Sequence, residues 1–481
     1  MKKLSYDTLC ENGYSGYLLE QAPERILQFG EGNFLRAFCD YFVDLLNERC
    51  GFNSKIVVCQ PIAQGLSQLI NDQQGLYTLY LRGFEIGEKV EQKRIISSIS
   101  RCFNPYEDYQ ALLDCARNSA LRYIISNTTE AGIVFDDGCH FEDAPPAAFP
   151  AKLTRFLYER YTAGLGGLVI LSCELIDNNG AELLRCVRAY ISLWALDAGF
   201  ARWVEEENIF CSTLVDRIVT GYPRTEAAAL NESNGYIDNL LVTAEVFGFW
   251  VIEAPDSLKD ELPFEKAGLP VIITADHTPY KQRKVRILNG AHTAMVPAAY
   301  LSGQDIVRGC MEDRVIAAFM DKAIFEEIIP TLALPYQELE SFAQSVSERF
   351  RNPFIDHALL SIAFNSTSKW RARVLPSLKG YISKFGRLPR CLTLSMAAYI
   401  ELYCGNKRGD DCYEISDDVF VLDLFREHKN DPTAQLVPLI LSNVKLWGED
   451  LTTINGFAEA VEGYLSEIRA TGMYETLKTV I

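Results

Sequence analysis

Short apolar runs alternate with helix-like segments through the first half of the chain, and this alternation does most to narrow the possible folds. The apolar runs are Arg25–Phe29, Lys55–Cys59, Tyr123–Ser126, Leu168–Cys173 and Ile209–Thr213. Strands that are apolar on both faces are typical of a parallel sheet covered by helices. The segments between them, such as Phe34–Asn47 and Tyr106–Asn118, carry helical periodicity. We therefore predict an α/β fold that begins with a Rossmann-like, doubly wound sheet.

The second half of the chain is dominated by long amphipathic patterns instead. Helices are expected at Lys284–Leu301, Asp313–Ile329, Pro353–Asn365, Leu392–Cys404 and Gly456–Ala470. The segment Asp276–Pro279 suits a boundary, because Pro279 disfavours helix at the residue before it. We expect a Rossmann-like nucleotide-binding domain at residues 1–280 and a mostly α-helical substrate domain at residues 281–481, with a ligand in the cleft between them.

Composition and charge exclude several classes of partner. The 481 residues include 46 Lys and Arg against 64 Asp and Glu, a net charge of -18. Nucleic acids and anionic membranes call for a basic surface, so neither is an expected partner. We find no secretory signal and no apolar run of about 18 residues. The 14 cysteines form no C-x-x-C pair, which favours reduced thiols in a cytoplasmic protein.

A glycine pair directly follows the first predicted strand. The segment Phe29-Gly30-Glu31-Gly32-Asn33-Phe34 places G-x-G between a strand and a helical pattern. Glycines there allow a tight turn and let backbone N–H groups approach a pyrophosphate. The third glycine of the usual fingerprint is absent, and a β-turn without a ligand is the alternative interpretation. At the end of the second strand Gln60 could hold a ribose hydroxyl, and no Lys or Arg follows at 61–68, which favours NAD over NADP.

One segment of the second half carries three polar groups suited to carbonyl chemistry. With about 100° per residue, Lys284 at the origin puts His292 at about 80° and Asn289 at about 140°, in one sector of an α-helix. Apolar side chains share this sector, which favours a partly buried face. A desolvated lysine can act as general acid or base, and Asn289 could donate to a developing oxyanion. The alternative is three unconnected, structural side chains, but Gly290 inside a helix suggests a close neighbour or ligand.

These two segments together resemble the long-chain polyol dehydrogenases, the mannitol dehydrogenase family. The resemblance rests on Phe29–Arg36 and on the Lys284-x4-Asn289-x2-His292 spacing. Further matching segments are Thr128-Thr129-Glu130, Ser172–Glu174 with Asn178–Gly180, Val215–Ile218 and Arg349–Pro353. Within the family, Leu27–Arg36, Leu288–Ala294 and Arg351–His357 are most similar to the branch that acts on tagaturonate.

The resemblance implies an NAD-dependent, metal-independent interconversion of D-tagaturonate and D-altronate. It implies Lys284 as acid/base, Asn289 in the oxyanion pocket and His292 as a substrate-positioning residue, with Thr129 and Glu130 at the cofactor. Where the family has Asp-Asn after the cysteine this chain has Glu174-Leu175, so Asn179 is our choice for a second oxyanion donor. The resemblance also places Asp216 near the lysine, although a buried ion pair is an alternative role for it.

An anionic sugar acid bound to so acidic a protein requires local cations. The second half offers Arg349, Arg351, His357, Lys369, Arg371 and Arg373, of which we select Arg349, His357 and Lys369 for the carboxylate. Arg36, beside the glycine pair, is a competing candidate for substrate or pyrophosphate.

The five histidines show no metal-binding spacing, so we expect no metal.

Three other hypotheses about function stay open at this point. A fructuronate reductase or a mannitol-type polyol dehydrogenase would share the same helix. A nucleotide-binding regulatory protein without turnover is the non-enzymatic alternative, but it would not need Lys284, Asn289 and His292 together. The oligomeric state is not predicted.

Overall fold

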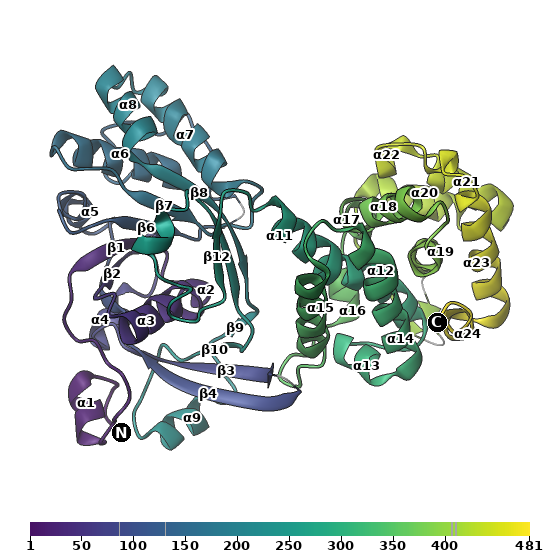
Figure 1. Cartoon of the computed structure of the whole chain (residues 1–481), viewed down its shortest axis with the longest axis horizontal. Helices are drawn as coiled ribbons and strands as arrows, with labels where there is room; N and C mark the ends of the chain where they lie inside the picture. The colour runs from purple at the N-terminus through teal and green to yellow at the C-terminus, as the bar shows by residue number, and fades with distance from the viewer. Residues whose placement is uncertain (86, 130, 406, 409–410) are drawn as a thin grey trace. The chain divides into compact units, whose positions relative to one another are not determined.

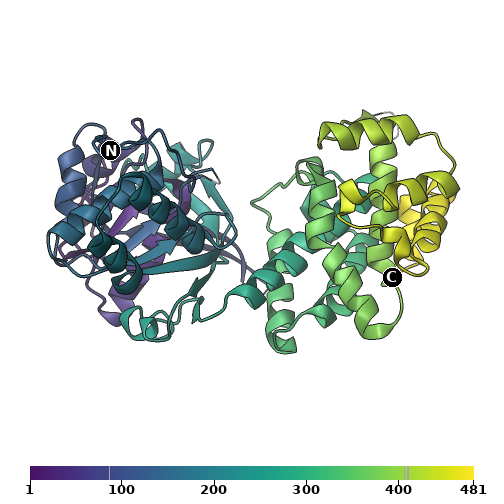
Figure 2. The ribbon, with the colours of Figure 1, turned by 90° about the horizontal axis from the view of Figure 1, so that it is seen from above.

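The protein is described here by a computed structural model covering residues 1–85, 87–129, 131–405, 407–408 and 411–481. Contacts divide the chain into two compact units, Met1–His277 and Thr278–Ile481 (Figure 1). The first unit contains two β-sheets, whereas the described part of the second is almost entirely helical (Figure 2). No helix in these described ranges has both the length and the apolar character needed to cross a membrane.

The first unit is built on an eight-stranded sheet in the order β12-β11-β8-β7-β6-β1-β2-β5. Neighbouring strands run parallel except β11 and β8, which are antiparallel. The fold prediction, a doubly wound sheet followed by a helical domain, is confirmed. The strands are β1 (Glu24–Phe29), β2 (Lys55–Cys59), β5 (Ile99–Phe103), β6 (Tyr123–Ser126), β7 (Val169–Ser172), β8 (Ile209–Asp216), β11 (Phe249–Glu253) and β12 (Val271–Thr274).

Both faces of this sheet are covered, which explains why its strands are apolar throughout. Along β1, Leu27 and Phe29 face one core and Ile26 faces the other, because side chains alternate along a strand. The first core is closed by helices α5 (Tyr109–Ala116), α6 (Phe149–Thr162), α7 (Asn179–Leu193) and α8 (Ala198–Glu207). The second core is closed mainly by α2 (Asn33–Ala37), α3 (Cys39–Cys50) and a smaller sheet.

The smaller sheet was not predicted from the sequence. It has four strands in the order β4-β3-β10-β9, with bounds β3 (Tyr77–Glu85), β4 (Glu88–Ile96), β9 (Val219–Gly221) and β10 (Val242–Glu245). Strands β3 and β4 form a long antiparallel hairpin. The remaining helices of the first unit are α1 (Tyr6–Glu11), α4 (Ser67–Asp72), α9 (Ala227–Asn234) and α10 (Leu258–Glu261).

The second unit packs its helices around buried aromatic and aliphatic side chains such as Trp370 and Tyr399. Its first part contains α11 (Thr278–Arg283), η1 (Lys284–Gly290), α12 (Ala291–Leu301), α13 (Val307–Glu312), α14 (Arg314–Lys322), η2 (Ala323–Ile328), η3 (Ile329–Thr331), α15 (Tyr336–Phe350) and α16 (Leu359–Ala363). Its second part contains α17 (Ser366–Arg373), α18 (Leu375–Phe385), α19 (Arg390–Cys404), β13 (Lys407–Arg408), β14 (Asp411–Cys412), α20 (Val419–His428), α21 (Thr433–Leu441), α22 (Val444–Trp447), η4 (Leu451–Thr453), α23 (Phe457–Thr471) and α24 (Met473–Lys478).

Several predicted helices differ from the structure. The expected helix Asp313–Ile329 is α-helical only as far as Lys322 and continues as the π-helix η2. The expected helix Phe34–Asn47 is broken at Phe38, whose φ of -129° and ψ of -80° separate α2 from α3. The expected helix Pro353–Asn365 is wrong over its first half, since only Leu359–Ala363 is helical. There Asn352 Oδ1 accepts the backbone N–H of Phe354 at 3.0 Å, a local bond that competes with helix formation.

Candidate active site

The strand order reverses between β1 and β6, and this position defines the ligand-binding edge of the first unit. Strand β1 pairs with β2 on one side and with β6 on the other, all parallel, so their carboxyl ends meet at one edge. In sheets of this kind, ligands bind outside the carboxyl ends at such a switch point. The glycine pair follows β1 here, and Asn127, Thr128 and Thr129 follow β6.

The loop after β1 has the conformation that its glycines were expected to provide. Phe29 is fully buried at the end of β1, and Gly30 has φ of +121°, which an L side chain rarely adopts. A Cβ on Gly30 would also lie 3.2 Å from Leu35 Cδ1. Gly32 and Asn33 are exposed and Phe34 is half-buried. The turn therefore presents open backbone at the switch point, which suits a dinucleotide.

Two other residues expected at the cofactor, Glu31 within this loop and Gln60 after β2, are buried. The Glu31 side chain is buried, and burial raises the pKa of its carboxyl. The Gln60 amide donates to the carbonyls of Ile62 and Ala63 at 2.8 and 3.2 Å and accepts from Ser67 N–H at 3.2 Å. Gln60 thus shapes the loop that follows β2.

The residues expected after β6 are only partly described. Thr129 is exposed near the end of that strand, and the expected contact from Glu130 lies outside the described residues. Thr128 donates to a buried carboxylate oxygen of Glu174 from its backbone N–H and its hydroxyl, both at 3.1 Å.

Arg36 is not placed as a ligand for substrate or pyrophosphate. Its side chain is buried, and it donates to the carbonyls of Glu31 and Leu240 and to Oδ1 of Asn33. Its guanidinium also lies 5.3 Å from the ring centroid of Tyr77. The sequence could not show this because the short helix α2 turns Arg36 inward. Arg36 therefore links the glycine loop, through Glu31, to the second core, through Leu240.

Asn179 is likewise committed to structural contacts. Its amide donates to the carbonyls of Glu174 at 2.8 Å and Thr213 at 3.1 Å, and its oxygen accepts from the N–H groups of Gly180 and Thr213. Both donors and both acceptor positions are used, which leaves none for a substrate. These contacts give Asn179 a structural role in place of the expected oxyanion donor. Asp216 is buried at the end of β8.

The segment Lys284–Gly290 forms a π-helix, η1, between α11 and α12. The prediction of one continuous α-helix is therefore wrong at this point. Flanking residues Arg283 and Ala291 keep α-helical dihedrals, so apolar periodicity does not reveal the wider turn. Lys284, Asn289 and His292 are all half-buried, as expected of a partly buried face. Within the described residues, no group hydrogen-bonds to the Asn289 amide. π-bulges are frequent at functional sites.

Gly290 marks a close approach between η1 and α17. A Cβ at Gly290 would lie 3.2 Å from the carbonyl oxygen of Arg373, the last residue of α17, and 3.4 Å from that of Val285. The sequence-based expectation of a close neighbour at Gly290 is confirmed. This contact brings the carboxyl end of α17, with its cations, against the segment that carries Lys284.

The His292 ring lies among aromatic side chains. It stacks on Phe350 at a centroid distance of 3.9 Å and an interplanar angle of 13°. The His357 ring meets it edge-on at 5.7 Å and 89°. Burial lowers the pKa of His292 well below 6.5, with further lowering by nearby positive charge, so the ring is neutral at neutral pH. His292 Nε2 is buried, and no group in the described part of the chain hydrogen-bonds to it.

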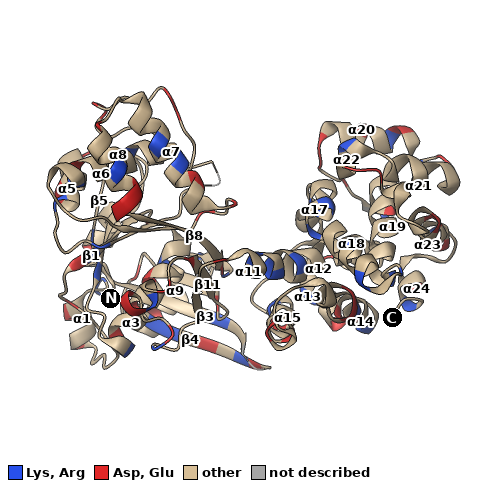
Figure 3. Ribbon diagram, turned by 45° about the horizontal axis from the view of Figure 1, so that its top comes forward, with Lys and Arg blue, Asp and Glu red and all other residues tan. Residues whose placement is uncertain are grey.

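Four basic side chains lower the pKa of His292. Together with His292 they form what we call the basic cluster: His292, Arg349, His357, Lys369 and Arg373. Basic residues on α11 and α17 are coloured blue in Figure 3. Burial and Arg373 lower the pKa of Lys369, and burial and Lys369 lower that of His357. Mutual repulsion of this kind is relieved when an anion binds. Arg349, His357 and Lys369 were expected for the carboxylate, whereas Arg373 was in the wider basic set but was not selected.

These features define a class of protein, an oxidoreductase with a Rossmann dinucleotide-binding unit followed by a helical unit. The family follows from sequence comparison. Residues 24–266 match the mannitol dehydrogenase Rossmann domain, and residues 276–469 match the mannitol dehydrogenase C-terminal domain. The chain therefore belongs to the mannitol dehydrogenase family, as its motifs suggested. No group of three or more His, Cys, Asp or Glu side chains in the described ranges could hold a metal ion.

Several bacterial relatives carry the name altronate oxidoreductase. The protein of Klebsiella pneumoniae (strain 342) is 49% identical and that of Escherichia coli O7:K1 (strain IAI39 / ExPEC) is 48% identical, each over 469 residues. These alignments cover 95% of this chain and 97% of each relative. The branch of the family that the motifs suggested is thus confirmed by the similarity to altronate oxidoreductases.

Two solved structures share the fold. A substrate-free D-sorbitol dehydrogenase superposes with a TM-score of 0.82 at 24% identity and covers 95% of both chains. Pseudomonas fluorescens mannitol 2-dehydrogenase, in a ternary complex with NAD and D-mannitol, gives a TM-score of 0.71 at 24% identity and covers 99% of both chains.

Proposed function

We propose that the protein catalyses the NAD-dependent interconversion of D-tagaturonate and D-altronate. The observation that carries this proposal is the basic cluster around His292, one member of which, Arg373, has its backbone carbonyl against Gly290 at the end of the segment that bears Lys284. A neutral polyol would not need it, whereas a sugar acid would. The nearly full-length similarity to altronate oxidoreductases supports the same substrate pair.

The dinucleotide would bind at the switch point of the large sheet. The exposed turn at Gly32 and Asn33 fits a pyrophosphate, because Gly30 adopts a positive φ and leaves the backbone open. The bound nicotinamide supplies or accepts a hydride. The residues proposed to line the cofactor are Phe29, Gly30, Glu31, Gly32, Asn33, Phe34, Gln60, Thr129 and Glu130. No Lys or Arg follows Gln60 in the loop at 61–68, so a 2′-phosphate would find no local partner there.

Proton transfer is assigned to Lys284. Its ammonium would protonate the oxygen of the keto group during reduction, and its neutral amine would remove that proton during oxidation. The Asn289 amide, which has no internal hydrogen bond among the described residues, would donate to the same oxygen as negative charge develops there. The neutral His292 ring would position the sugar through its unpartnered Nε2.

The substrate carboxylate would bind in the basic cluster. Lys369 donates one N–H to the carbonyl of Ile362 at 2.9 Å, which leaves ammonium protons for an anion. Arg349 and Arg373 offer planar guanidinium groups, which match a carboxylate in bidentate geometry. His357 is exposed at the edge of the cluster.

Substrate comparison with one matched pair of variants tests this assignment. Steady-state rates with NADH are measured on tagaturonate, fructuronate and fructose for the wild-type, Lys369→Met and Arg371→Met proteins. Arg371 is the control, since it is an exposed cation of the same helix that is not among the groups acting on His292.

We expect tagaturonate to be the preferred substrate of the wild-type protein. Lys369→Met should raise the KM for tagaturonate at least about 30-fold, because a desolvated charge-assisted contact is lost, while any rate on fructose is unchanged. Arg371→Met should behave as wild type. A preference for fructose, or equal effects of the two variants, would contradict a carboxylate site in the basic cluster.

A further inference from the structure

The loop after β2 lacks the acidic residue that many NAD sites carry there. In sheets of this kind an Asp or Glu at the end of the second strand commonly binds the ribose hydroxyls of NAD. Here β2 ends at Cys59 and Gln60 follows it. The Gln60 amide is already hydrogen-bonded to three backbone groups of its own loop. The ribose hydroxyls of a dinucleotide therefore need another acceptor.

The Glu31 carboxyl reaches this region from the glycine loop. A Cβ built on Gly65, in the loop after β2, would lie 2.2 Å from Glu31 Oε1 and 2.5 Å from Gln60 Oε1. Gly65 does not have a positive φ, so space and not backbone strain requires a glycine there. The loop after β2 thus leaves room for the Glu31 carboxyl beside Gln60, where the acidic residue of an NAD site is usually found.

The electrostatic neighbours of Glu31 agree with this direction. Burial, followed by the Glu31 charge, raises the pKa of the Cys102 thiol on β5, the strand beside β2. Backbone N–H groups of Glu31 itself and of Leu66 hydrogen-bond to the carboxyl, and the Arg36 guanidinium also favours its charged form against burial. A carboxylate has about four acceptor positions, so about two remain for a ligand. Glu31 is 8% exposed, so it is not sealed inside the core.

Two exposed hydrophobic side chains lie on the loops at the same edge. Ile62 follows β2 and is 61% exposed, and Tyr106 follows β5 and is 40% exposed. The Tyr106 hydroxyl donates to the Pro61 carbonyl at 3.4 Å, and Asn104 Nδ2 donates to the Ala63 carbonyl at 3.1 Å, so the two loops lie side by side. Ligand sites are lined largely by apolar and aromatic side chains. This surface suits the adenine ring of a dinucleotide whose ribose lies near Glu31.

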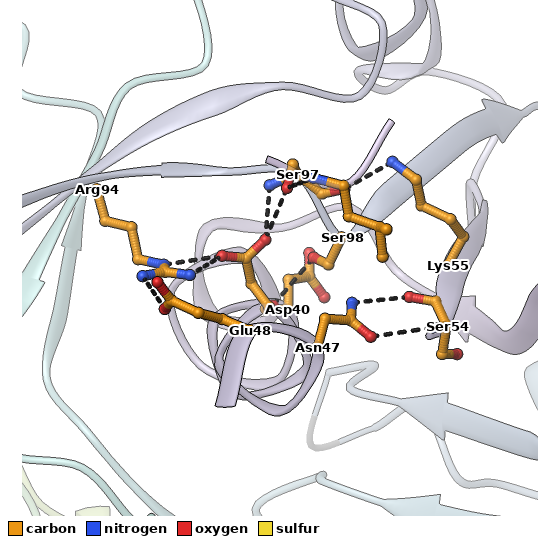
Figure 4. A network of polar contacts seen from close by, with 10 residues as sticks. Asp40, Asn47, Glu48, Ser54, Lys55, Arg94, Ser97 and Ser98 are labelled. Atoms are coloured by element: carbon orange, nitrogen blue, oxygen red, sulfur yellow. Dashed lines mark hydrogen bonds and ion pairs between the residues drawn. The ribbon is translucent and has the colours of Figure 1, made fainter. Parts of the chain in front are cut away.

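The strands that carry these loops are held together at their opposite ends. Lys55 begins β2, and its Nζ donates to the Ser97 carbonyl at 2.6 Å, as Figure 4 shows, and to the Ile99 carbonyl of β5 at 3.2 Å. The N–H and hydroxyl of Ser97 donate to Asp44 of α3 at 2.9 and 3.0 Å. The loops at the carboxyl ends therefore start from strands of fixed spacing, which a precise binding site requires.

We propose that Glu31 selects NAD over NADP: its carboxylate accepts hydrogen bonds from the hydroxyls of the adenosine ribose and repels a 2′-phosphate. This inference rests on the proposed dinucleotide site and adds the residue that recognises the ribose. A hydroxyl gains a charge-assisted hydrogen bond there, whereas a phosphate would face a carboxylate with no Lys or Arg at 61–68 to offset it. A carboxyl that only supports the Leu66 backbone would instead affect both dinucleotides equally.

The test measures the Kd of the full-length protein for NADH, for NADPH and for NADH that lacks the 2′-hydroxyl of the adenosine ribose, by titration of the nicotinamide fluorescence. The wild type should bind NADH at least about a hundredfold more tightly than NADPH and about tenfold more tightly than the deoxy analogue. Glu31→Gln should weaken NADH binding about tenfold and bring the Kd for NADPH to within about tenfold of that for NADH. In this variant, loss of the hydroxyl should cost less than about threefold, because its partner is already weakened.

Two further variants separate charge from position. Glu31→Asp keeps the charge on a side chain shorter by one methylene, so it should bind NADH about tenfold more weakly and still reject NADPH. Glu107→Gln is the matched control, because it removes an exposed carboxyl beside Tyr106 in the loop after β5. It should keep the wild-type preference.

Equal weakening of NADH and NADPH binding by Glu31→Gln, or a lost preference in Glu107→Gln, would overturn the inference. A wild-type protein that binds NADPH or the deoxy analogue as tightly as NADH would also overturn it, and that measurement needs no variant to fold. Absence of binding to every dinucleotide would instead overturn the proposed function on which the inference rests.

Discussion

Replacing Gly290 by alanine tests how closely the lysine-bearing helix and the basic cluster are coupled. The new Cβ would lie 3.2 Å from the carbonyl oxygen of Arg373 and 3.4 Å from that of Val285. The first distance is shorter than an ordinary contact and involves backbone, so α17 must move by a few tenths of an ångström. That movement shifts the end of the helix that carries Lys369 and Arg373.

The magnitude follows from two opposing terms. Alanine is favoured over glycine in a helix by about 1 kcal/mol, whereas overpacking a buried contact costs about 1–3 kcal/mol. Gly290→Ala should therefore destabilise the protein by about 0–2 kcal/mol. A misplacement of about 1 Å near a reacting centre can cost about a hundredfold in rate, so a shift of a few tenths should lower kcat/KM for tagaturonate about three- to tenfold.

The matched control is Gly463→Ala on α23, where an added Cβ meets nothing within 4 Å. This change should stabilise the protein by about 1 kcal/mol and leave catalysis unchanged. Urea unfolding measures the stabilities, and steady-state rates on tagaturonate measure the coupling. If Gly290→Ala gained stability as the control does and kept full kcat/KM, the close approach would have no part in catalysis.

Three further predictions concern individual side chains. Lys284→Ala should lower kcat by about a hundredfold to ten-thousandfold while the Kd for NADH is unchanged; a variant with nearly full kcat would remove Lys284 as the acid/base. Arg36→Lys should lose two of its three hydrogen bonds and destabilise the protein by about 2–4 kcal/mol. NADH binding should be weaker, whereas the KM for tagaturonate in steady-state assays should not change. A selective rise in that KM would support the substrate-binding role first expected for Arg36. Because the folded pKa of His292 lies well below 6.5, the unfolded chain binds more protons as the pH falls below 6.5, so stability should decrease there. Urea unfolding of His292→Gln at several pH values should show a smaller acid-dependent loss than the wild type, and equal losses would contradict a neutral buried ring.

The large sheet could be predicted from the sequence because both of its faces are covered. Runs such as Lys55–Cys59 and Tyr123–Ser126 are apolar whichever way a side chain points, and all residues of these strands are buried. The smaller sheet gives no such signal. Its outer strand Glu88–Ile96 is mostly exposed and charged, so it looks like a loop.

The glycine loop was also predictable, but the direction of its neighbouring side chains was not. The position of Gly30 after a buried strand follows from local pattern, and its positive φ agrees with it. Whether Arg36 points outward to a ligand or inward to Leu240 depends on the break at Phe38 and on contacts some 204 positions away. Asn179 is similar, since this first residue of α7 forms hydrogen bonds with Thr213 on strand β8, which lies 34 positions further along the chain.

The π-helix changes the geometry of the candidate catalytic residues in a direction that favours the proposed chemistry. In an α-helix Lys284 and Asn289, five residues apart, would point about 140° apart around the axis. A π-helix closes its hydrogen bonds between residues five apart, so its wider turn brings these two side chains toward a common face. In the proposed reaction, a single substrate oxygen would then accept from the Lys284 ammonium and the Asn289 amide together. The spacing Lys284-x4-Asn289 thus has a physical reason that α-helical periodicity alone does not supply.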